Sequence, residues 1–245
     1  MNRLKSLSMP RPAPPASDTN VSTAVYSPGH PHAPQALFGP LHYEPNYAYP
    51  LLVWLHGPGD DETQLRRVMP MISLRNYVAV APRGTGASAG RSGHGWPQNQ
   101  AEIGLAEQRV FDGIDAARRK FHVHERRIFL AGFDCGGTMA FRLALMHPEM
   151  FAGVISLGGA FPSRHSPLAR LNRARNLPIL LSTGRDSGVY PPEKVCEDLR
   201  LFHTAGFQVA LRQYPCGQEI ALNMLSDIDR WMMEQINCPA TSICE

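Results

Sequence analysis

The chain has 245 residues, of which 43% are hydrophobic, so it is long enough to bury one sizeable core. Its net charge of +3 is too small to indicate a nucleic-acid-binding protein, and no apolar run reaches the length of a membrane span. The five cysteines are scattered without metal-ligand spacing. We therefore expect reduced thiols, no metal site and, by default, a cytoplasmic protein.

The first part of the chain differs in composition from the rest. Residues 1–20 are rich in Pro, Ser and Ala and poor in aromatic residues, which predicts a disordered leader. This leader lacks the apolar stretch of a secretory signal. Residues 21–245 are expected to form a single domain, which begins with two strands near Val21–Tyr26 and Leu37–Tyr43.

Short apolar runs alternate with helical patterns along the remainder of the chain. The runs predict strands at Leu51–Leu55, Tyr77–Ala81, Ile128–Ala131, Val154–Leu157, Ile179–Leu181 and Val209–Gln213. Helices are predicted at Glu102–Phe121, Thr138–His147, Pro192–Ala205 and Glu219–Ile236. This alternation is typical of an α/β fold with a mostly parallel central sheet and helices on both faces. In such sheets the ligand binds beyond the carboxyl ends of the strands, so one crevice is expected there.

A glycine-rich turn follows one of the predicted buried strands. Residues 128–137 read Ile-Phe-Leu-Ala-Gly-Phe-Asp-Cys-Gly-Gly, and a predicted helix comes directly after them. This is the strand–turn–helix setting of the G-x-S-x-G nucleophile elbow, in which a hydrolase keeps its catalytic serine at the central position. Here the central residue is Asp134.

Three further segments occur in a fixed order around this turn. They are Leu-Val-Trp-Leu-His-Gly-Pro-Gly-Asp-Asp-Glu (52–62), Gly-Arg-Asp-Ser-Gly-Val-Tyr-Pro (184–191) and Tyr-Pro-Cys-Gly-Gln-Glu-Ile (214–220). Together with residues 128–137 they resemble the carboxylesterase/phospholipase family of α/β-hydrolases, which includes acyl-protein thioesterases. The resemblance covers roughly residues 49–236. It implies an α/β-hydrolase fold and a Ser-Asp-His triad that hydrolyses carboxylic esters or thioesters without a cofactor.

The resemblance places other residue types at every triad position. The family's serine falls on Asp134, its acid on Ser187 and its histidine on Gln218. Asp186 lies one residue before the acid position, and a shift of the loop would be needed to bring it there. Asp134 has no hydroxyl and places a negative charge where an oxyanion should form. Gln218 forms hydrogen bonds but does not carry a proton near neutral pH.

The oxyanion hole is also altered. The family uses two backbone N–H groups, which fall here on Cys135 and Pro58, and proline has no N–H to donate. The chain is therefore expected to be a degenerate hydrolase that keeps its fold and a ligand crevice and has lost serine-hydrolase chemistry.

Alternatives remain open from the residues alone. Asp134 is a competent nucleophile or base for esters, alkyl halides or epoxides if His94 or His165 replaces the missing histidine. Cys135, at a helix N-terminus, offers a reactive thiol or a redox bridge to Cys216, but a buried, inert thiol is the favoured interpretation of each cysteine. A third alternative is a non-catalytic interaction protein whose leader docks a partner.

Four residues are candidates for contact with a small-molecule ligand, anionic or acyl-bearing. His56 belongs to the oxyanion segment, and Trp96 is expected to form a pocket wall. Arg164 and Arg170 belong to Ser163–Pro178, a basic segment without acidic residues at the place where this fold often carries a lid. The sequence indicates no cofactor and no oligomeric state.

Overall fold

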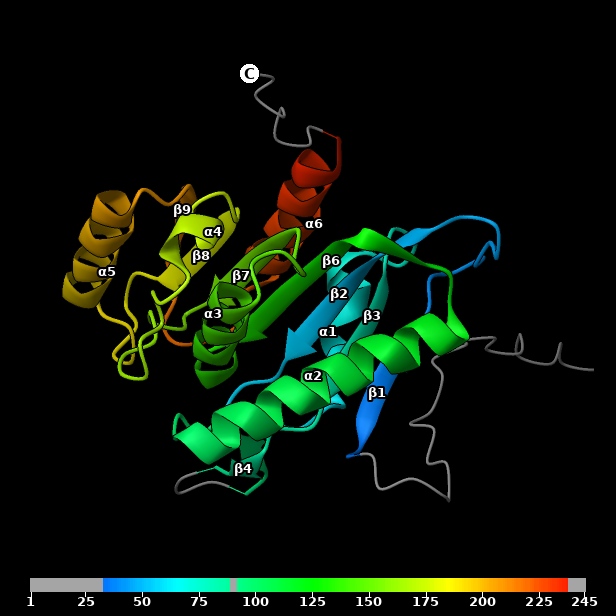
Figure 1. Cartoon of the computed structure of the whole chain (residues 1–245), viewed down its shortest axis with the longest axis horizontal. Helices are drawn as coiled ribbons and strands as arrows, with labels where there is room; N and C mark the ends of the chain where they lie inside the picture. The colour runs from blue at the N-terminus through cyan, green and yellow to red at the C-terminus, as the bar shows by residue number, and fades with distance from the viewer. Residues whose placement is uncertain (1–32, 89–91, 238–245) are drawn as a thin grey trace, which may run out of the picture.

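The computed structural model describes residues 33–88 and 92–237, which form a central sheet covered by helices (Figure 1). The seven strands of the sheet are β1 (Gln35–Phe38), β2 (Tyr49–Leu55), β3 (Val78–Pro82), β6 (Val123–Phe133), β7 (Gly153–Leu157), β8 (Ile179–Gly184) and β9 (Val209–Tyr214). Their spatial order is β1-β3-β2-β6-β7-β8-β9, and only the first pair, β1 with β3, is antiparallel. The carboxyl ends of six parallel strands therefore meet at one edge.

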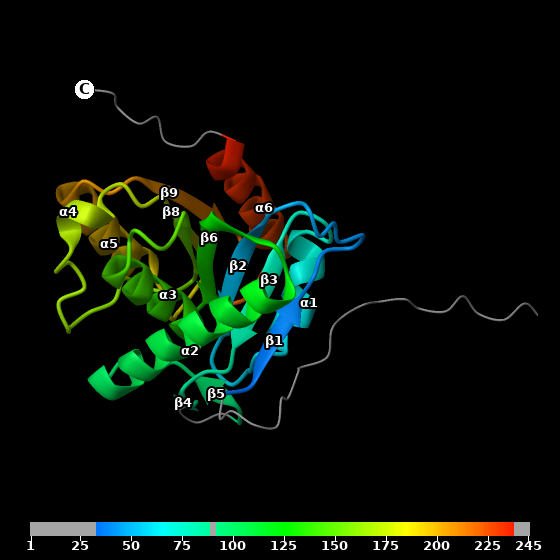
Figure 2. The same cartoon turned by 45° about the vertical axis from the view of Figure 1, so that its right-hand side comes forward.

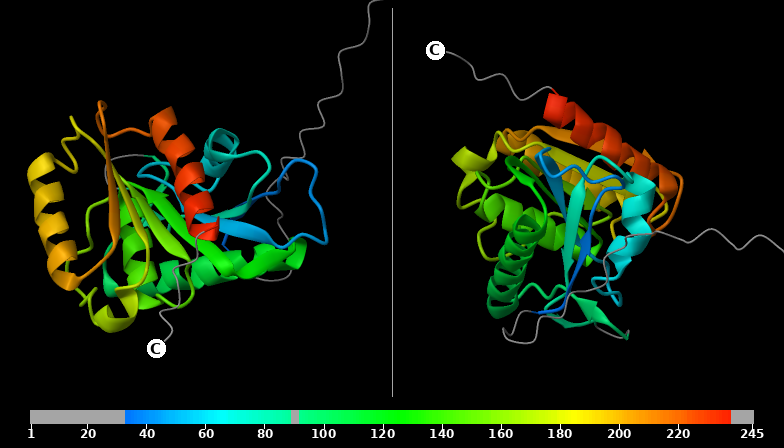
Figure 3. Two further views of the ribbon diagram at one scale, coloured as in Figure 1. Left: turned by 90° about the horizontal axis from the view of Figure 1, so that it is seen from above. Right: turned by 90° about the vertical axis from the view of Figure 1, so that its right-hand side faces the viewer.

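The helices lie in two layers on opposite faces of the sheet (Figure 2; Figure 3, right). They are α1 (Gln64–Ile72), α2 (Gln100–Lys120), α3 (Cys135–Met146), α4 (Leu171–Ala174), α5 (Pro192–Ala205) and α6 (Leu222–Asn237). The buried residues of α2, α3 and α5 share one core cluster, and those of α1 and α6 share another. Two short strands, β4 (Gly86–Ala87) and β5 (His94–Gly95), pair with each other outside the main sheet.

Strand β2 shows why its sequence selects this arrangement. Leu51, Val53 and Leu55 pack in the core with α2 and α3, whereas Leu52 and Trp54 pack in the core with α1 and α6. Successive side chains of a strand point to opposite faces, so a strand covered on both sides must be apolar throughout. The indole Nε1 of Trp54 is satisfied in this core because it donates to Gln64 Oε1 over 2.8 Å.

The expectation of a mostly parallel sheet with helices on both faces is confirmed. Several element bounds were predicted wrongly. The strand expected at Leu37–Tyr43 ends at Phe38, because Gly39 and Pro40 interrupt it, and β6 starts five residues earlier than expected. Helices α1 and α4 and the β4–β5 pair were not predicted, and α6 begins only at Leu222.

Two predictions fall outside the described residues: the leader at residues 1–20 and the strand near Val21–Tyr26. Within residues 33–88 and 92–237, no helix combines the length and the apolar character needed to cross a membrane.

Candidate functional site

The turn between β6 and α3 has the strained backbone of a nucleophile elbow. Asp134 has φ 53° and ψ −120°, a conformation that costs a non-glycine residue about 1–3 kcal/mol. Hydrogen bonds on both sides hold it: its N–H donates to Leu157 O over 2.8 Å, and its carbonyl accepts from Thr138 N over 3.0 Å. The elbow geometry has therefore been kept although the residue at its tip is an aspartate.

Glycines allow the close approach of α3 to the sheet. A Cβ on Gly136 would lie 2.3 Å from Leu55 O and 2.5 Å from His56 O, and both are backbone atoms of β2 or the residue that follows it. A Cβ on Gly132 would lie 2.4 Å from the carbonyl of Gly136. Both positions tolerate no side chain without a shift of the backbone.

The three residues at the triad positions form one chain of hydrogen bonds. Ser187 Oγ donates to Gln218 Oε1 over 2.6 Å, and Gln218 Nε2 donates to Asp134 Oδ2 over 2.9 Å. Asp134 and Gln218 are 84 residues apart in the sequence, and the carboxyl ends of β6 and β9 bring them together. Ser187, Gln218 and Asp134 are thus connected in the same order as the acid, base and nucleophile of a catalytic triad, although none of them is the residue type that the triad uses.

The neighbours of Gln218 fix the orientation of its amide. Nε2 faces two acceptors, Asp134 Oδ2 and Gly158 O, each at 2.9 Å, so both of its hydrogens are used. Oε1 faces the Ser187 hydroxyl, which in turn accepts from Tyr190 N over 3.0 Å. If the amide were flipped, its oxygen would face a carboxylate and a carbonyl, and an oxygen acceptor cannot donate to either of them. Gln218 therefore presents only N–H groups to Asp134 and has no lone pair there to accept a proton.

Asp186 lies apart from this chain. Its carboxylate pairs with the neighbouring Arg185 at 3.2 Å, and 61% of its side chain is exposed. Ser187, which is 3% exposed, lies against Gln218 instead. The loop therefore does not make the one-residue shift that would bring Asp186 to the acid position.

The oxyanion segment offers little to a developing negative charge. Pro58 has no N–H, and the N–H groups on either side of it already have acceptors. Gly57 N donates to Gln64 Oε1 over 3.3 Å, and Gly59 N donates to His94 O over 2.9 Å. The N–H of Cys135, in the first turn of α3, is then the donor best placed to face a ligand beside Asp134.

His56 braces this segment from inside the protein. Its ring is 0% exposed, and Gly84 N donates to Nε2 over 2.8 Å, so the ring proton lies on Nδ1 and is donated to Gly57 O over 2.8 Å. The indole of Trp96, 2% exposed, donates to His56 O over 3.0 Å. We expected His56 and Trp96 to contact a ligand. The structure corrects this expectation, because both side chains are buried and their polar atoms are already hydrogen-bonded.

Burial lowers the pKa of His56 below its ordinary value of 6.5, more than the hydrogen bond to Gly57 raises it. The neutral ring is favoured in the fold, so stability is fully present above pH 6.5 and falls as the pH drops below it. We expect the free energy of unfolding to decrease by up to about 1.4 kcal/mol per pH unit from this group. Urea titrations at several pH values measure it. The slope of the unfolding free energy against pH should decrease in His56→Gln. It should persist in His203→Gln, which replaces an exposed histidine and serves as the control. An unchanged slope in His56→Gln would contradict this assignment.

The thiols of Cys135 and Cys216 lie in surroundings that disfavour their ionised form. Burial raises the pKa of Cys135, outweighing the effects of neighbouring backbone groups, and burial also raises the pKa of Cys216. Both shifts disfavour the thiolate, so they weigh against the alternative of a reactive Cys135 and agree with a buried, inert thiol. Cys135, Cys196 and Cys216 are all free cysteines in the structure.

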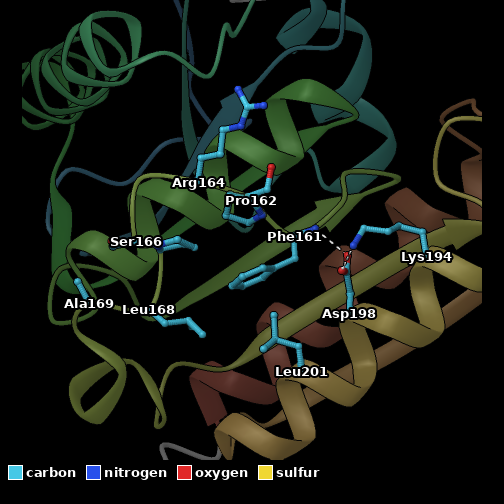
Figure 4. Close-up of a pocket in the computed structure, with 11 residues that line it drawn as sticks. Phe161, Pro162, Arg164, Ser166, Leu168, Ala169, Lys194, Asp198 and Leu201 are labelled. Carbon is cyan, nitrogen blue, oxygen red and sulfur yellow. Dashed lines mark hydrogen bonds and ion pairs between the residues drawn. The ribbon is translucent and has the colours of Figure 1, made fainter.

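The basic segment after β7 lines a cavity of about 540 Å³ against α5 (Figure 4). In this view Lys194 reaches the carboxylate of Asp198, whereas the side chain of Arg164 points away from that pair. Asp198 is 2% exposed and also accepts from Phe161 N and Tyr190 Oη, at 2.9 and 2.8 Å. Arg170 is half-exposed and lies 3.7 Å from Glu149. Arg164 lines this cavity and Arg170 does not, and neither joins the hydrogen-bonded chain at Asp134.

A second cavity, of about 430 Å³, adjoins the elbow on the other side of the sheet. Phe133, which precedes Asp134, and Ile220, which follows Gln218 by two residues, both line it. Its other walls come from α1 and the start of α6, mostly through apolar side chains such as Val68 and Leu225. This cavity was not predicted because helix α1 was not predicted, although Leu65, Val68, Met69 and Ile72 follow helical spacing.

No group of three or more His, Cys, Asp or Glu side chains suited to a metal ion occurs in the described parts of the chain.

Comparisons with known proteins agree with this geometry. The sequence model of the phospholipase/carboxylesterase family matches residues 44–235. NocK of Nocardia uniformis subsp. tsuyamanensis, a protein whose name contains the word esterase, is 30% identical over 141 residues. That match covers 54% of this chain and 38% of NocK, so the chain aligns with well under half of that relative's length.

Solved structures show the same fold at low identity. Acyl-protein thioesterase 2 of Zea mays has a TM-score of 0.68 at 17% identity, over 83% of this chain and 99% of that protein. A carboxylesterase of Mesorhizobium loti has a TM-score of 0.66 at 24% identity, over 82% and 94%. The family match, the sheet order and the strained elbow together show that this chain belongs to the phospholipase/carboxylesterase family of the α/β-hydrolase superfamily.

Proposed function

We propose that this protein is a degenerate member of its family, which binds a small acyl-bearing ligand beside the elbow and no longer performs serine-hydrolase chemistry. The observation that carries the proposal is the Ser187–Gln218–Asp134 chain. Its hydrogen bonds are fully satisfied, and each residue lacks the group that the reaction needs. No hydroxyl is present at the elbow, no lone pair faces it from Gln218, and no carboxylate stands behind Gln218.

The cavity that adjoins the elbow supports the binding half of this proposal. Its volume of about 430 Å³ lies in the usual range for small-molecule sites. Apolar side chains form most of its wall, and Asp60, Gln64 and Arg67 add polar groups, of which Asp60 and Arg67 form an ion pair. An alkyl or acyl chain fits such a lining better than a strongly polar ligand does.

Restoring the nucleophile alone should not restore activity. We expect Asp134→Ser to hydrolyse a short-chain nitrophenyl ester at the rate of buffer alone, because Gln218 still faces the elbow with N–H groups and gives the new hydroxyl no base. Stopped assays of nitrophenolate release measure this rate, with Asp134→Ala as the matched variant that has no hydroxyl. Robust turnover by Asp134→Ser would refute the loss of the base.

The observation that favours a second function is the strained presentation of Asp134 itself. An aspartate at this position suits attack on an alkyl halide or epoxide, or activation of water. His94 lies in the short strand β5, which pairs with the oxyanion segment through backbone hydrogen bonds with Gly59 and Asp60, and is our candidate for a replacement base. A covalent adduct on Asp134, detected by mass spectrometry after mixing with such substrates, would support this function. The absence of both adduct and Asp134-dependent turnover would remove it.

The free state of Cys135, Cys196 and Cys216 supports a reducing compartment, and we propose the cytoplasm as the place where the protein works.

A further inference from the structure

A third cavity, of about 290 Å³, lies around a buried arginine toward the C-terminal end of α3, whereas Asp134 lies at the N-terminal end of this helix. It is bounded by α2, by the last turns of α3 and by residues 165–170 of the segment after β7. Arg142 follows Asp134 by eight residues on α3, which corresponds to about 12 Å along the helix axis. The cavity is therefore separate from the triad positions.

Arg142 carries a buried charge that has no acidic partner among the described residues. It is 1% exposed, and its three hydrogen bonds all go to neutral oxygens. Nε donates to Gln98 Oε1 over 2.9 Å, Nη2 to Ser163 O over 2.7 Å and Nη1 to Arg164 O over 3.1 Å. Burial alone acts on the pKa of this guanidinium and lowers it. A buried charge without a counter-charge is costly, so an anion that reached it would be strongly favoured.

The guanidinium also keeps donors for a ligand. It has five N–H groups, and three of them make the bonds just described. One N–H remains on each terminal nitrogen, and each can donate to an oxygen of a carboxylate or phosphate.

The remaining lining of the cavity is also cationic on balance. Arg170 lines it and has only a distant, half-exposed partner in Glu149, at 3.7 Å. The carboxylate in the lining, Glu107, is engaged by His147 Nε2 at 2.6 Å. His165 adds an imidazole to the same cavity. An entering anion therefore meets two arginines, and the carboxylate nearby is already paired.

The loop that closes the cavity is held in a strained conformation. Arg164, His165 and Ser166 have φ values of 61°, 52° and 47°, so three consecutive non-glycine residues are left-handed. Each costs about 1–2 kcal/mol, and such strain persists only where the surroundings enforce it. The two bonds from Arg142 to the carbonyls of Ser163 and Arg164 hold the start of this stretch. Strain of this kind gathers at ligand clamps.

We propose that this cavity binds a small oxyanion, a carboxylate or a phosphate, through the free N–H pair of Arg142, with Arg170 and His165 at its sides. The site is independent of any chemistry at Asp134 and remains whether or not the elbow is active. Inorganic phosphate and acetate are small enough for the volume and distinguish the two classes of oxyanion.

The test is a calorimetric titration of the full chain with phosphate and, separately, with acetate. Sodium chloride keeps the ionic strength constant at about 0.15 M, so that general screening is the same throughout. Saturable binding of at least one anion is expected in the wild type. Arg142→Lys keeps the charge without the fork and should weaken binding about tenfold. Arg170→Gln should weaken it about threefold, as for a half-exposed charge.

Further variants separate binding from folding. Arg119→Gln, an exposed charge on α2 away from the cavity, should bind like the wild type. If Arg142→Lys fails to fold, Arg170→Gln and His165→Ala still decide the question, because neither side chain makes the bonds that hold the loop. The proposal is overturned if neither anion binds saturably to the wild type. It is also overturned if the cavity variants that fold bind like Arg119→Gln.

Discussion

We expect the triple variant Asp134→Ser/Ser187→Asp/Gln218→His to hydrolyse a short-chain nitrophenyl ester at least about a hundredfold faster than Asp134→Ser alone. The reason is geometric. The amide of Gln218 already lies between Ser187 Oγ at 2.6 Å and Asp134 Oδ2 at 2.9 Å, which is where an imidazole would need its two nitrogens. The strained elbow would then present a serine hydroxyl to that imidazole. Nitrophenolate release under saturating ester measures the effect.

The controls for this experiment are the partial combinations. Each double replacement leaves one of nucleophile, base and acid missing and each single replacement leaves two, so these variants should stay near background. Adding Pro58→Ala to the triple variant supplies a second oxyanion N–H and should raise the rate by a further factor of about ten or more. A triple variant that folds and remains at background would show that the retained geometry is not that of a working triad.

The replacement Gly136→Ala should destabilise the protein by about 3 kcal/mol. Its Cβ would lie 2.3 Å from Leu55 O and 2.5 Å from His56 O, so the start of α3 must move away from β2. Neither contact can be relieved by a flexible side chain, because both atoms belong to the backbone. The free energy of unfolding, measured by urea titration, reports this loss.

A second helical glycine provides the matched control. Gly104 lies in α2, and a Cβ built there meets nothing within 4 Å. Gly104→Ala should therefore stabilise the protein by about 0.5–1 kcal/mol through helix propensity alone. Both replacements put an alanine in a helix, so a large difference between the two variants reports the contact of residue 136 with β2. Equal stabilities for the two variants would contradict the close approach of α3 to the sheet.

The sheet was predictable because its strands are short apolar runs with helical patterns between them. The elements that were not predicted contain residues that are unusual for the structure they form. Pro70 lies inside α1 and argues against a helix there, so that helix was not predicted although its apolar residues follow helical spacing. Strand β6 extends back through His124–Arg127, whose polar side chains do not resemble a buried strand.

The hydrogen-bonded chain at the elbow was predictable only as a set of positions. The order of the four motifs placed Asp134, Ser187 and Gln218 at equivalent sites, but no sequence pattern states which way an amide points. The contacts of Gln218 with Gly158 O and Asp134 Oδ2 decide it. They also show that the substitutions fit one another, because each donor in the chain faces an acceptor.

Arg142 could not have been singled out from the sequence. It stands in an apolar helix, and its charge, spacing and neighbours in the chain suggest no role. Its burial depends on the carbonyls of Ser163 and Arg164, two residues of a loop after another strand. Likewise, the sequence suggested ligand contacts for His56 and Trp96, yet packing buries both side chains beneath the oxyanion segment.

The measurement that tests the central claim most directly is ester hydrolysis by the wild type beside Asp134→Ala. The Ser187–Gln218–Asp134 chain predicts equal rates at the level of buffer, because Asp134 has neither a hydroxyl nor a base. Activity in the wild type that Asp134→Ala abolishes would contradict this account and would show that Asp134 itself carries the chemistry.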